Sequence, residues 1–220
     1  MATAKIWSNV QVAMESTTGA TKTITGITLA SATITATHDF AAGDYVKFTN
    51  VGGTIEINGR AFRVKSVSTT VSFVLEGPVA GSTLDMTAFG TWTSGGTITK
   101  ITYGTSLGTA KGLSASGGDY NFIDTTTIHD KVATQIPGLA SPISYTFENI
   151  WDVADAALLA MKAASDAKLQ KAFKFTFADG AIMIFNGYVG ATLLPGGNAQ
   201  DLVTTQSVMT LFGAPTYYTA

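Results

Sequence analysis

The sequence contains no cysteine, so disulfide bridges, thiolate metal sites and cysteine nucleophiles are excluded. Histidine is almost as scarce: the chain has only His38 and His129, and neither stands in an HExxH arrangement. A histidine in a polar loop is far more often a surface residue than a general base. We therefore expect no enzyme, no metal site and no cofactor.

Charge is also scarce. Asp, Glu, Lys and Arg make up 13% of the chain, against about a quarter in an average globular protein. Apolar residues make up 45%, and the net charge is only -2. Because charge keeps protein surfaces apart, this composition favours self-association. The alternative is a compact monomer with a poorly charged surface.

Long hydrophobic runs are missing as well. No stretch of 18 apolar residues occurs, and the opening residues Met1-Ala2-Thr3-Ala4-Lys5 lack an apolar core of signal-peptide length. We therefore expect neither a membrane-spanning segment nor export by that route.

The last third of the chain carries a helical pattern. Val153, Ala157, Met161 and Ala164 recur at the spacing that places one stripe of a helix against a core. Asp152 precedes the stripe and is the expected N-cap. The sequence predicts one amphipathic helix here.

A hairpin follows the helix. Phe173, Phe175 and Phe177 alternate with polar residues, as in a strand with one dry face, and Asp179-Gly180 then predicts a tight turn. The return strand from residue 182 to 189 is apolar on both faces. It is either an interior strand of a single-chain sandwich or, as we favour, a strand that completes its burial against another subunit.

The region before residue 102 differs in composition. Residues 24–101 carry five basic and five acidic side chains, whereas residues 102–220 carry six and nine. Turn dipeptides separate short strands in the first region, and Asn58-Gly59 predicts a hairpin whose Arg60, Arg63 and Lys65 face solvent. This pattern predicts a small all-β module.

The module's motifs carry a resemblance. Gly43-Asp44-Tyr45-Val46, Val51-Gly52-Gly53 and residues 56–64 resemble a small β-domain common in bacteriophage structural proteins, often labelled after the first catalytic-cysteine half-domain of ubiquitin-activating enzymes. Ubiquitin chemistry does not follow, because the chain has no cysteine. The resemblance implies an inserted structural module at 24–101. We expect it to project outward, and we expect assembly to survive its removal.

The remaining order of elements resembles the major tail tube protein of long flexible-tailed bacteriophages. That order is an opening strand, a long polar stretch from Gly104 to Pro142, a helix, the Asp-Gly hairpin and a last strand. Within the polar stretch we expect Tyr120, Phe122 and Ile128 to pack in an ordered strand, and residues 108–118 to form a loop that orders on contact with a neighbour.

That resemblance implies a mainly β fold, a sandwich of two antiparallel sheets with one flanking α-helix, formed by residues 1–23 and 102–220. It also implies homo-oligomeric rings of six, stacked into a hollow tube for DNA ejection. The implied partners are other tail proteins (tape measure, terminator and tip complex) and genomic DNA that passes without specific binding. The implied location is the virion tail, and the host cytoplasm during assembly.

Three sets of candidate site residues follow. A tube that passes DNA should avoid cationic patches, because each neutralised phosphate adds affinity. The expected lumen-facing residues are Thr204, Gln206, Thr210, Asp119, Asp124 and Asp201. The expected inter-subunit residues are Met183, Phe185, Val189, Gly112 and Leu113. If the module contacts host-surface sugars, its candidate residues are Tyr45, Phe89 and Trp92.

Two other functions remain open. The chain could be another virion protein, such as a tail terminator or a head decoration protein. It could also be a carbohydrate-binding β-sandwich that uses Trp7, Trp92 and Trp151 as platforms. These tryptophans are scattered along the chain and are more typical of core or interface anchors.

Overall fold

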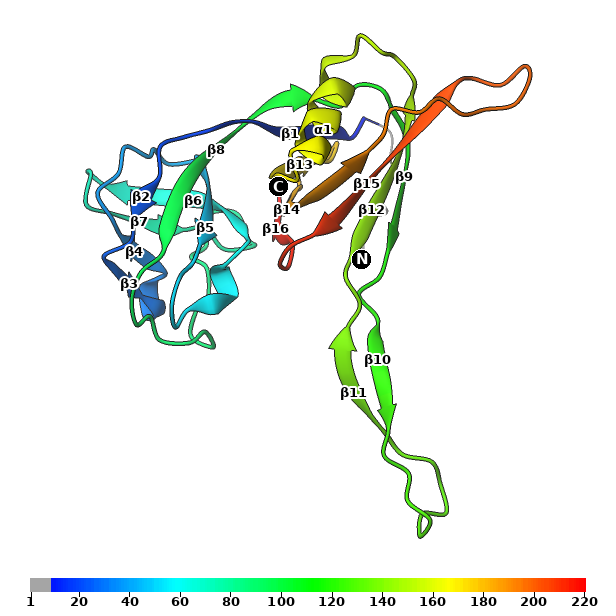
Figure 1. Cartoon of the computed structure of the whole chain (residues 1–220). Helices are drawn as coiled ribbons and strands as arrows, with labels where there is room; N and C mark the ends of the chain where they lie inside the picture. The colour runs from blue at the N-terminus through cyan, green and yellow to red at the C-terminus, as the bar shows by residue number, and fades with distance from the viewer. Residues whose placement is uncertain (1–8) are drawn as a thin grey trace.

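The computed structural model describes residues 9–220 (Figure 1). Strands dominate this part of the chain, with one α-helix and two short 3-10 helices. The elements are β1 (Gln11–Thr18), β2 (Lys22–Thr23), β3 (Gly26–Thr28), η1 (Leu29–Ser31), β4 (Thr33–Thr35), β5 (Tyr45–Thr49), η2 (Ile55–Ile57), β6 (Ala61–Ser68), β7 (Ser72–Leu75), β8 (Thr97–Ser106), β9 (Ala110–Ser116), β10 (Tyr120–Asp124), β11 (Gln135–Ala140), β12 (Ser144–Ile150), α1 (Ala156–Asp166), β13 (Gln170–Thr176), β14 (Ile182–Ala191), β15 (Thr204–Leu211) and β16 (Thr216–Tyr218).

The sandwich is built around β14, which belongs to both of its sheets. On one edge, β14 pairs with β13 from Ile182 to Tyr188, and the order continues from β13 to β1 and β8. On its other edge, the start of β14 pairs with the short strand β16. The second half pairs with β15, and the order continues through β12 to β9. All these pairs are antiparallel, as the sequence predicts.

Aromatic side chains fill the space between the two sheets. Phe147 of β12 stacks on Phe173 of β13 at 5.9 Å between ring centroids, and Phe173 stacks in turn on Phe185 of β14. All three rings are buried. Their contacts hold the sheets face to face, and Met161 of α1 joins the same cluster. The predicted sandwich with one flanking helix is confirmed.

The helix begins later than the sequence predicts. Asp155 is the N-cap, and its carboxylate accepts a hydrogen bond from the Leu158 N–H. Asp152 instead accepts from the Ala154 N–H in the preceding turn, so the expected cap was wrong. Val153 is exposed, whereas Ala157, Met161 and Ala164 are buried as predicted.

The predicted hairpin is confirmed. Phe173 and Phe175 face the core from β13, and Phe177 follows the strand at its turn. Gly180 has φ +86°, which a residue with a side chain rarely adopts, so glycine makes the tight reversal possible. The sequence thus fixes the register of β13 on β14.

The second face of β14 is covered within the chain, and this corrects our favoured interpretation. Ile184 is fully buried against Ala61, Ile101, Ala172 and Tyr218. The expected inter-subunit residues of this strand, Met183, Phe185 and Val189, are buried in the sandwich core of the same subunit. They therefore have no surface left to offer another subunit, and β14 is an interior strand.

Residues 24–98 enclose a hydrophobic core of their own, which includes Phe48, Phe62 and Phe73. The expected Asn58-Gly59 hairpin was wrong: residues 55–57 form the short helix η2, and β6 pairs with β5 and β7. Nor do the cations of β6 simply face solvent, because Arg63 pairs with Glu76 and lies over the Tyr218 ring. The strand β8 runs through residue 101 without a break. The division into two domains stays a prediction.

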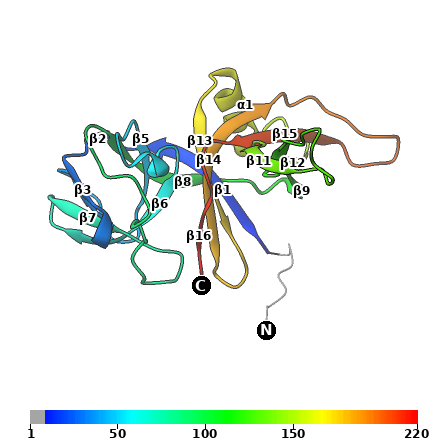
Figure 2. The ribbon, with the colours of Figure 1, turned by 90° about the horizontal axis from the view of Figure 1, so that it is seen from below.

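The glycine- and serine-rich stretch is strand rather than loop. Residues 110–116 form β9 and pair with residues 144–149 of β12, which satisfies the backbone groups of β9 that face β12. Beyond them β10 and β11 form a separate two-stranded sheet that projects away from the sandwich (Figure 1). Figure 2 shows the module and the sandwich side by side, joined through β1 and β8.

Candidate assembly surfaces

The projecting hairpin, residues 119–141, is here called the arm. Its strands pair over Tyr120–Asp124 and Gln135–Ala140, and its tip spans residues 125–134. Apolar side chains cover it and are more than half exposed, which contradicts the expectation that they pack in this subunit. They are Tyr120, Phe122, Ile123, Ile128, Val132, Ile136 and Leu139.

The arm exposes apolar groups on both faces. Ile123 and Ile136 are cross-strand partners on one face, and Phe122 lies opposite Pro137 on the other. An isolated two-stranded hairpin is marginally stable in water, because neither face is shielded. Apolar exposure of this extent marks an interaction surface.

The outer face of β9, β12 and β15 is mostly polar, with Ile150 and Val208 as exposed apolar members. Register pairs place Ser114 opposite Thr146, and Thr146 opposite Val208. The polar members of this face are Ser114, Ser116, Ser144, Thr146, Thr204, Gln206 and Thr210. Its charged groups, Lys111 and Glu148, lie 3.5 Å apart, so the cation has a partner. This set is here called the polar face.

The six residues expected to face the lumen therefore lie in three different places. Thr204, Gln206 and Thr210 lie together on the polar face. Asp201 lies in the loop before β15, where it accepts a hydrogen bond from the Asn198 side chain and lines a small hollow with Lys111 and Glu148. Asp119 and Asp124 lie on the arm, away from this face. The Asp124 carboxylate accepts a hydrogen bond from the Thr126 N–H, as is typical of a turn residue.

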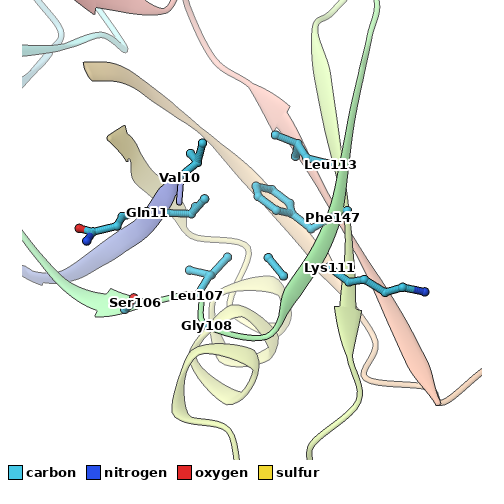
Figure 3. A pocket seen from close by; sticks show the side chains of 11 residues that line it. Val10, Gln11, Ser106, Leu107, Gly108, Lys111, Leu113 and Phe147 are labelled. Carbon is cyan, nitrogen blue, oxygen red and sulfur yellow. The ribbon is translucent and has the colours of Figure 1, made fainter. Parts of the chain in front are cut away.

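A groove lies at the open side of the sandwich, between β9 and the ends of β1 and β8 (Figure 3). It has a volume of about 500 Å³. Leu107, Leu113 and Phe147 point into it, while Lys111 turns its ammonium away (Figure 3). Gly112 also lines it. The strand β9 ends the sheet order, and within residues 9–220 it pairs only with β12, so no other described strand pairs with its outer edge.

The aromatic residues expected to bind sugars on the module are engaged in packing. Trp92 and Phe89 are half-buried against the module core, and the Trp92 Nε1–H donates to the Gly95 carbonyl at 3.0 Å. Tyr45 packs edge-on against Tyr103 at 5.2 Å. All three are partly buried, and their role in binding sugars stays a prediction.

Lys174 lies between these two tyrosines. Its ammonium is 5.3 Å from the Tyr45 ring centre and 5.2 Å from that of Tyr103. Burial lowers the pKa of Lys174 and raises that of the Tyr103 phenol well above its ordinary value. The charge is therefore held at the junction between module and sandwich, remote from the polar face.

The described residues show no catalytic constellation. Gly104-Thr105-Ser106-Leu107-Gly108 has the spacing of a nucleophile elbow, which the sequence interpretation overlooked, but Ser106 ends β8 and is followed by strand β9 instead of a helix. His38 is buried against Phe40 and Phe73, and His129 lies at the arm tip. Within residues 9–220 no cluster of His, Asp and Glu is suited to a metal, and no helix could cross a membrane.

These features define a structural β-sandwich protein that presents an apolar arm, an open strand edge and a neutral polar face. The sequence profile of the phage tail tube protein family (TTP) matches residues 52–220. The chain belongs to this family. No curated protein matches the sequence.

Membership places the chain among structural proteins of the phage virion tail, which assemble with other tail components. The matched range also begins inside the module, at residue 52, so part of the module belongs to the region that the family profile describes. The family profile therefore includes residues of the module from residue 52 onward.

Proposed function

We propose that this protein assembles into rings of six that stack into the hollow tail tube through which DNA is ejected into the host. The single observation that carries self-assembly is the arm, whose apolar faces are uncovered in the isolated subunit. Head-to-tail contacts of this kind repeat without limit when the rotation between copies does not close.

The lateral contact within a ring is the unpaired edge of β9, with Gly112 and Leu113 beside the groove. A strand edge is a ready template for pairing with another chain. Closing a ring through these edges joins the sheets of neighbouring subunits and leaves no edge exposed. Gly112 and Leu113, which the sequence predicts at a subunit interface, are part of this proposed contact.

The polar face lines the channel. DNA carries one negative charge about every 1.7 Å of duplex axis, and each Lys or Arg that neutralises a phosphate adds affinity. A surface of Ser, Thr and Gln with one paired cation gives the passing DNA little to bind. We further propose that residues 24–101 form the module as a separate domain. In the tube, this domain projects outward.

The arm can be tested by substitution. Phe122→Ser combined with Ile123→Ser removes apolar area on both arm faces without touching the sandwich core. Negative-stain electron microscopy should then show single subunits or short oligomers where the unchanged protein forms tubes. Val153→Ser is the matched control, because Val153 is equally exposed but lies before α1. Tubes of normal length from the arm variant would contradict the proposal.

A further inference from the structure

Arg60 is exceptional among the cations at the junction between module and sandwich. Lys47 pairs with Glu15, Arg63 with Glu76 and Lys100 with Asp44, and Lys174 lies over two tyrosine rings. Within residues 9–220, Arg60 has no carboxylate partner and its side chain donates no hydrogen bond. Its Nε is buried and unpaired.

The guanidinium of Arg60 is held in place rather than free in solvent. It lies over the Phe62 ring, 4.9 Å from the ring centre. Burial lowers the pKa of Arg60, which means that the charge is partly withdrawn from water. A fixed, partly desolvated guanidinium without an acceptor is costly unless a partner supplies one.

A pair of exposed aromatic residues lies next to Gly59, the residue before Arg60. Phe212 lies directly over Gly59, where an added Cβ would come within 2.3 Å of the Phe212 ring, and Tyr188 packs edge-on against Phe212 at 6.3 Å. Both side chains are almost half exposed. Arg60, Tyr188 and Phe212 form what we call the junction patch, and arginine and aromatic residues are enriched at protein–protein interfaces.

The arm has the complementary chemistry. It carries Asp119, Asp124 and Asp130 against a single Lys131, together with its exposed apolar side chains. Asp124 and Asp130 each accept hydrogen bonds from neighbouring threonines. The carboxylate of Asp119 accepts none in the described part of the chain, because Ser141 bonds only to the Asp119 carbonyl.

We propose that the junction patch receives the arm of a second copy of this chain, with Asp119 accepting hydrogen bonds from Arg60 and the arm's aromatic side chains packing on Tyr188 and Phe212. This proposal rests on the proposed self-assembly and names the surface that the arm occupies. An arm carboxylate satisfies the unpaired guanidinium, and the apolar contacts shield both surfaces from water.

Cross-linking tests the contact directly, because the natural chain has no cysteine. One protein carries Ala214→Cys, at an exposed site beside the patch, and a second carries Asn121→Cys on the arm. Oxidation of the assembled mixture should give the 214–121 disulfide dimer. A mixture of the Ala214→Cys and Val153→Cys proteins is the control. Normal tubes with no more cross-linking than the control would overturn this proposal while leaving self-assembly intact.

Charge reversal tests the ion pair. Arg60→Glu and Asp119→Arg should each raise the critical concentration for assembly at least about tenfold, as expected when one partner of a desolvated charge pair is lost. Combining the two substitutions should restore assembly, whereas Arg60→Glu with Asp124→Arg should not. Circular dichroism verifies folding, and Arg60→Gln replaces any variant that does not fold. Unchanged assembly by Arg60→Gln would overturn the proposal, and unchanged protein that never assembles would overturn the proposed function itself.

Discussion

At the scale of single residues, the junction between module and sandwich depends on a buried carboxylate. Glu15 is 1% exposed and bonds to the Lys47 ammonium at 2.9 Å and to the Ala172 N–H at 3.0 Å. Thr18 donates to it as well. One side chain thus connects β1 with β5 and β13, and this arrangement leaves no lone pair of the carboxylate in an apolar environment.

We predict that Glu15→Ala lowers the free energy of unfolding by about 3–5 kcal/mol, because it leaves Lys47 with an uncompensated charge at a mostly buried site. Urea denaturation measures the change. Asp166→Ala is the control: it breaks an exposed pair with Lys162, where a loss of about 0.5 kcal/mol is expected. Equal effects of the two substitutions would contradict this account.

A second carboxylate makes the junction sensitive to acid. Desolvation raises the pKa of Glu76, but hydrogen bonds from the Arg63 guanidinium and the Gly81 N–H outweigh it and hold the pKa below its ordinary value. A lowered folded-state pKa contributes stability above the unfolded pKa, and this contribution is lost as the pH falls. We predict that stability decreases below about pH 4.3, the ordinary glutamate value. In Glu76→Gln that part of the pH dependence should disappear from thermal unfolding curves.

At the scale of elements, the sequence predicted those parts whose signals are local. The alternation of Phe173 and Phe175 and the turn at Gly180 lie within a dozen residues, and both were confirmed. The sequence did not predict which residues cover the second face of β14. They include Ala61 and Tyr218, which lie more than 30 residues from Ile184 along the chain. Among the candidate assembly surfaces, the shared face of the polar residues of β15 was predicted from alternation alone. Arg60 was assigned to a solvated face, whereas its Nε is buried.

The C-terminal strand β16 and the residue after it also contact the module. Tyr218 accepts a hydrogen bond from the Arg63 N–H at 2.7 Å, and the Thr219 N–H donates to the Pro78 carbonyl. Removing residues 24–101 would uncover Ile184 and Tyr218 together. This consequence speaks against the expectation that assembly survives deletion of the module.

The helix offers an element-scale prediction. Asp155→Ala should lower the free energy of unfolding by about 1 kcal/mol, because the Leu158 N–H loses its capping acceptor. Asp152→Ala, three residues earlier, should cost clearly less, since Asp152 bonds only within the preceding turn. Chemical denaturation of both variants distinguishes the caps. A larger loss from Asp152→Ala would restore the cap that the sequence first suggested.

At the scale of the whole molecule, the arm, the module and the polar face lie on different sides of the subunit, which gives it a direction. The arm extends from the β9 and β12 end of the sandwich, and the module lies on the other side of β14 (Figures 1 and 2). The polar face occupies the outer side of β9, β12 and β15. Such a subunit has unlike surfaces to join, which is the requirement for head-to-tail stacking.

Assembly should change the accessibility of the arm. We predict that trypsin cleaves the free subunit after Lys131, which lies exposed at the arm tip outside any strand. In assembled material the site should be protected. Mass spectrometry of the fragments after timed digestion measures the rates, with cleavage after the exposed Lys168 as the internal reference. Equal cleavage at Lys131 before and after assembly would mean that the arm stays uncovered.

Electron microscopy of the purified, unchanged protein over a range of concentrations tests the central claim most directly. The account predicts hollow tubes or stacked rings, with six subunits per ring and an open axial channel. Particles that remain single subunits at every concentration, or that associate without a channel, would contradict it.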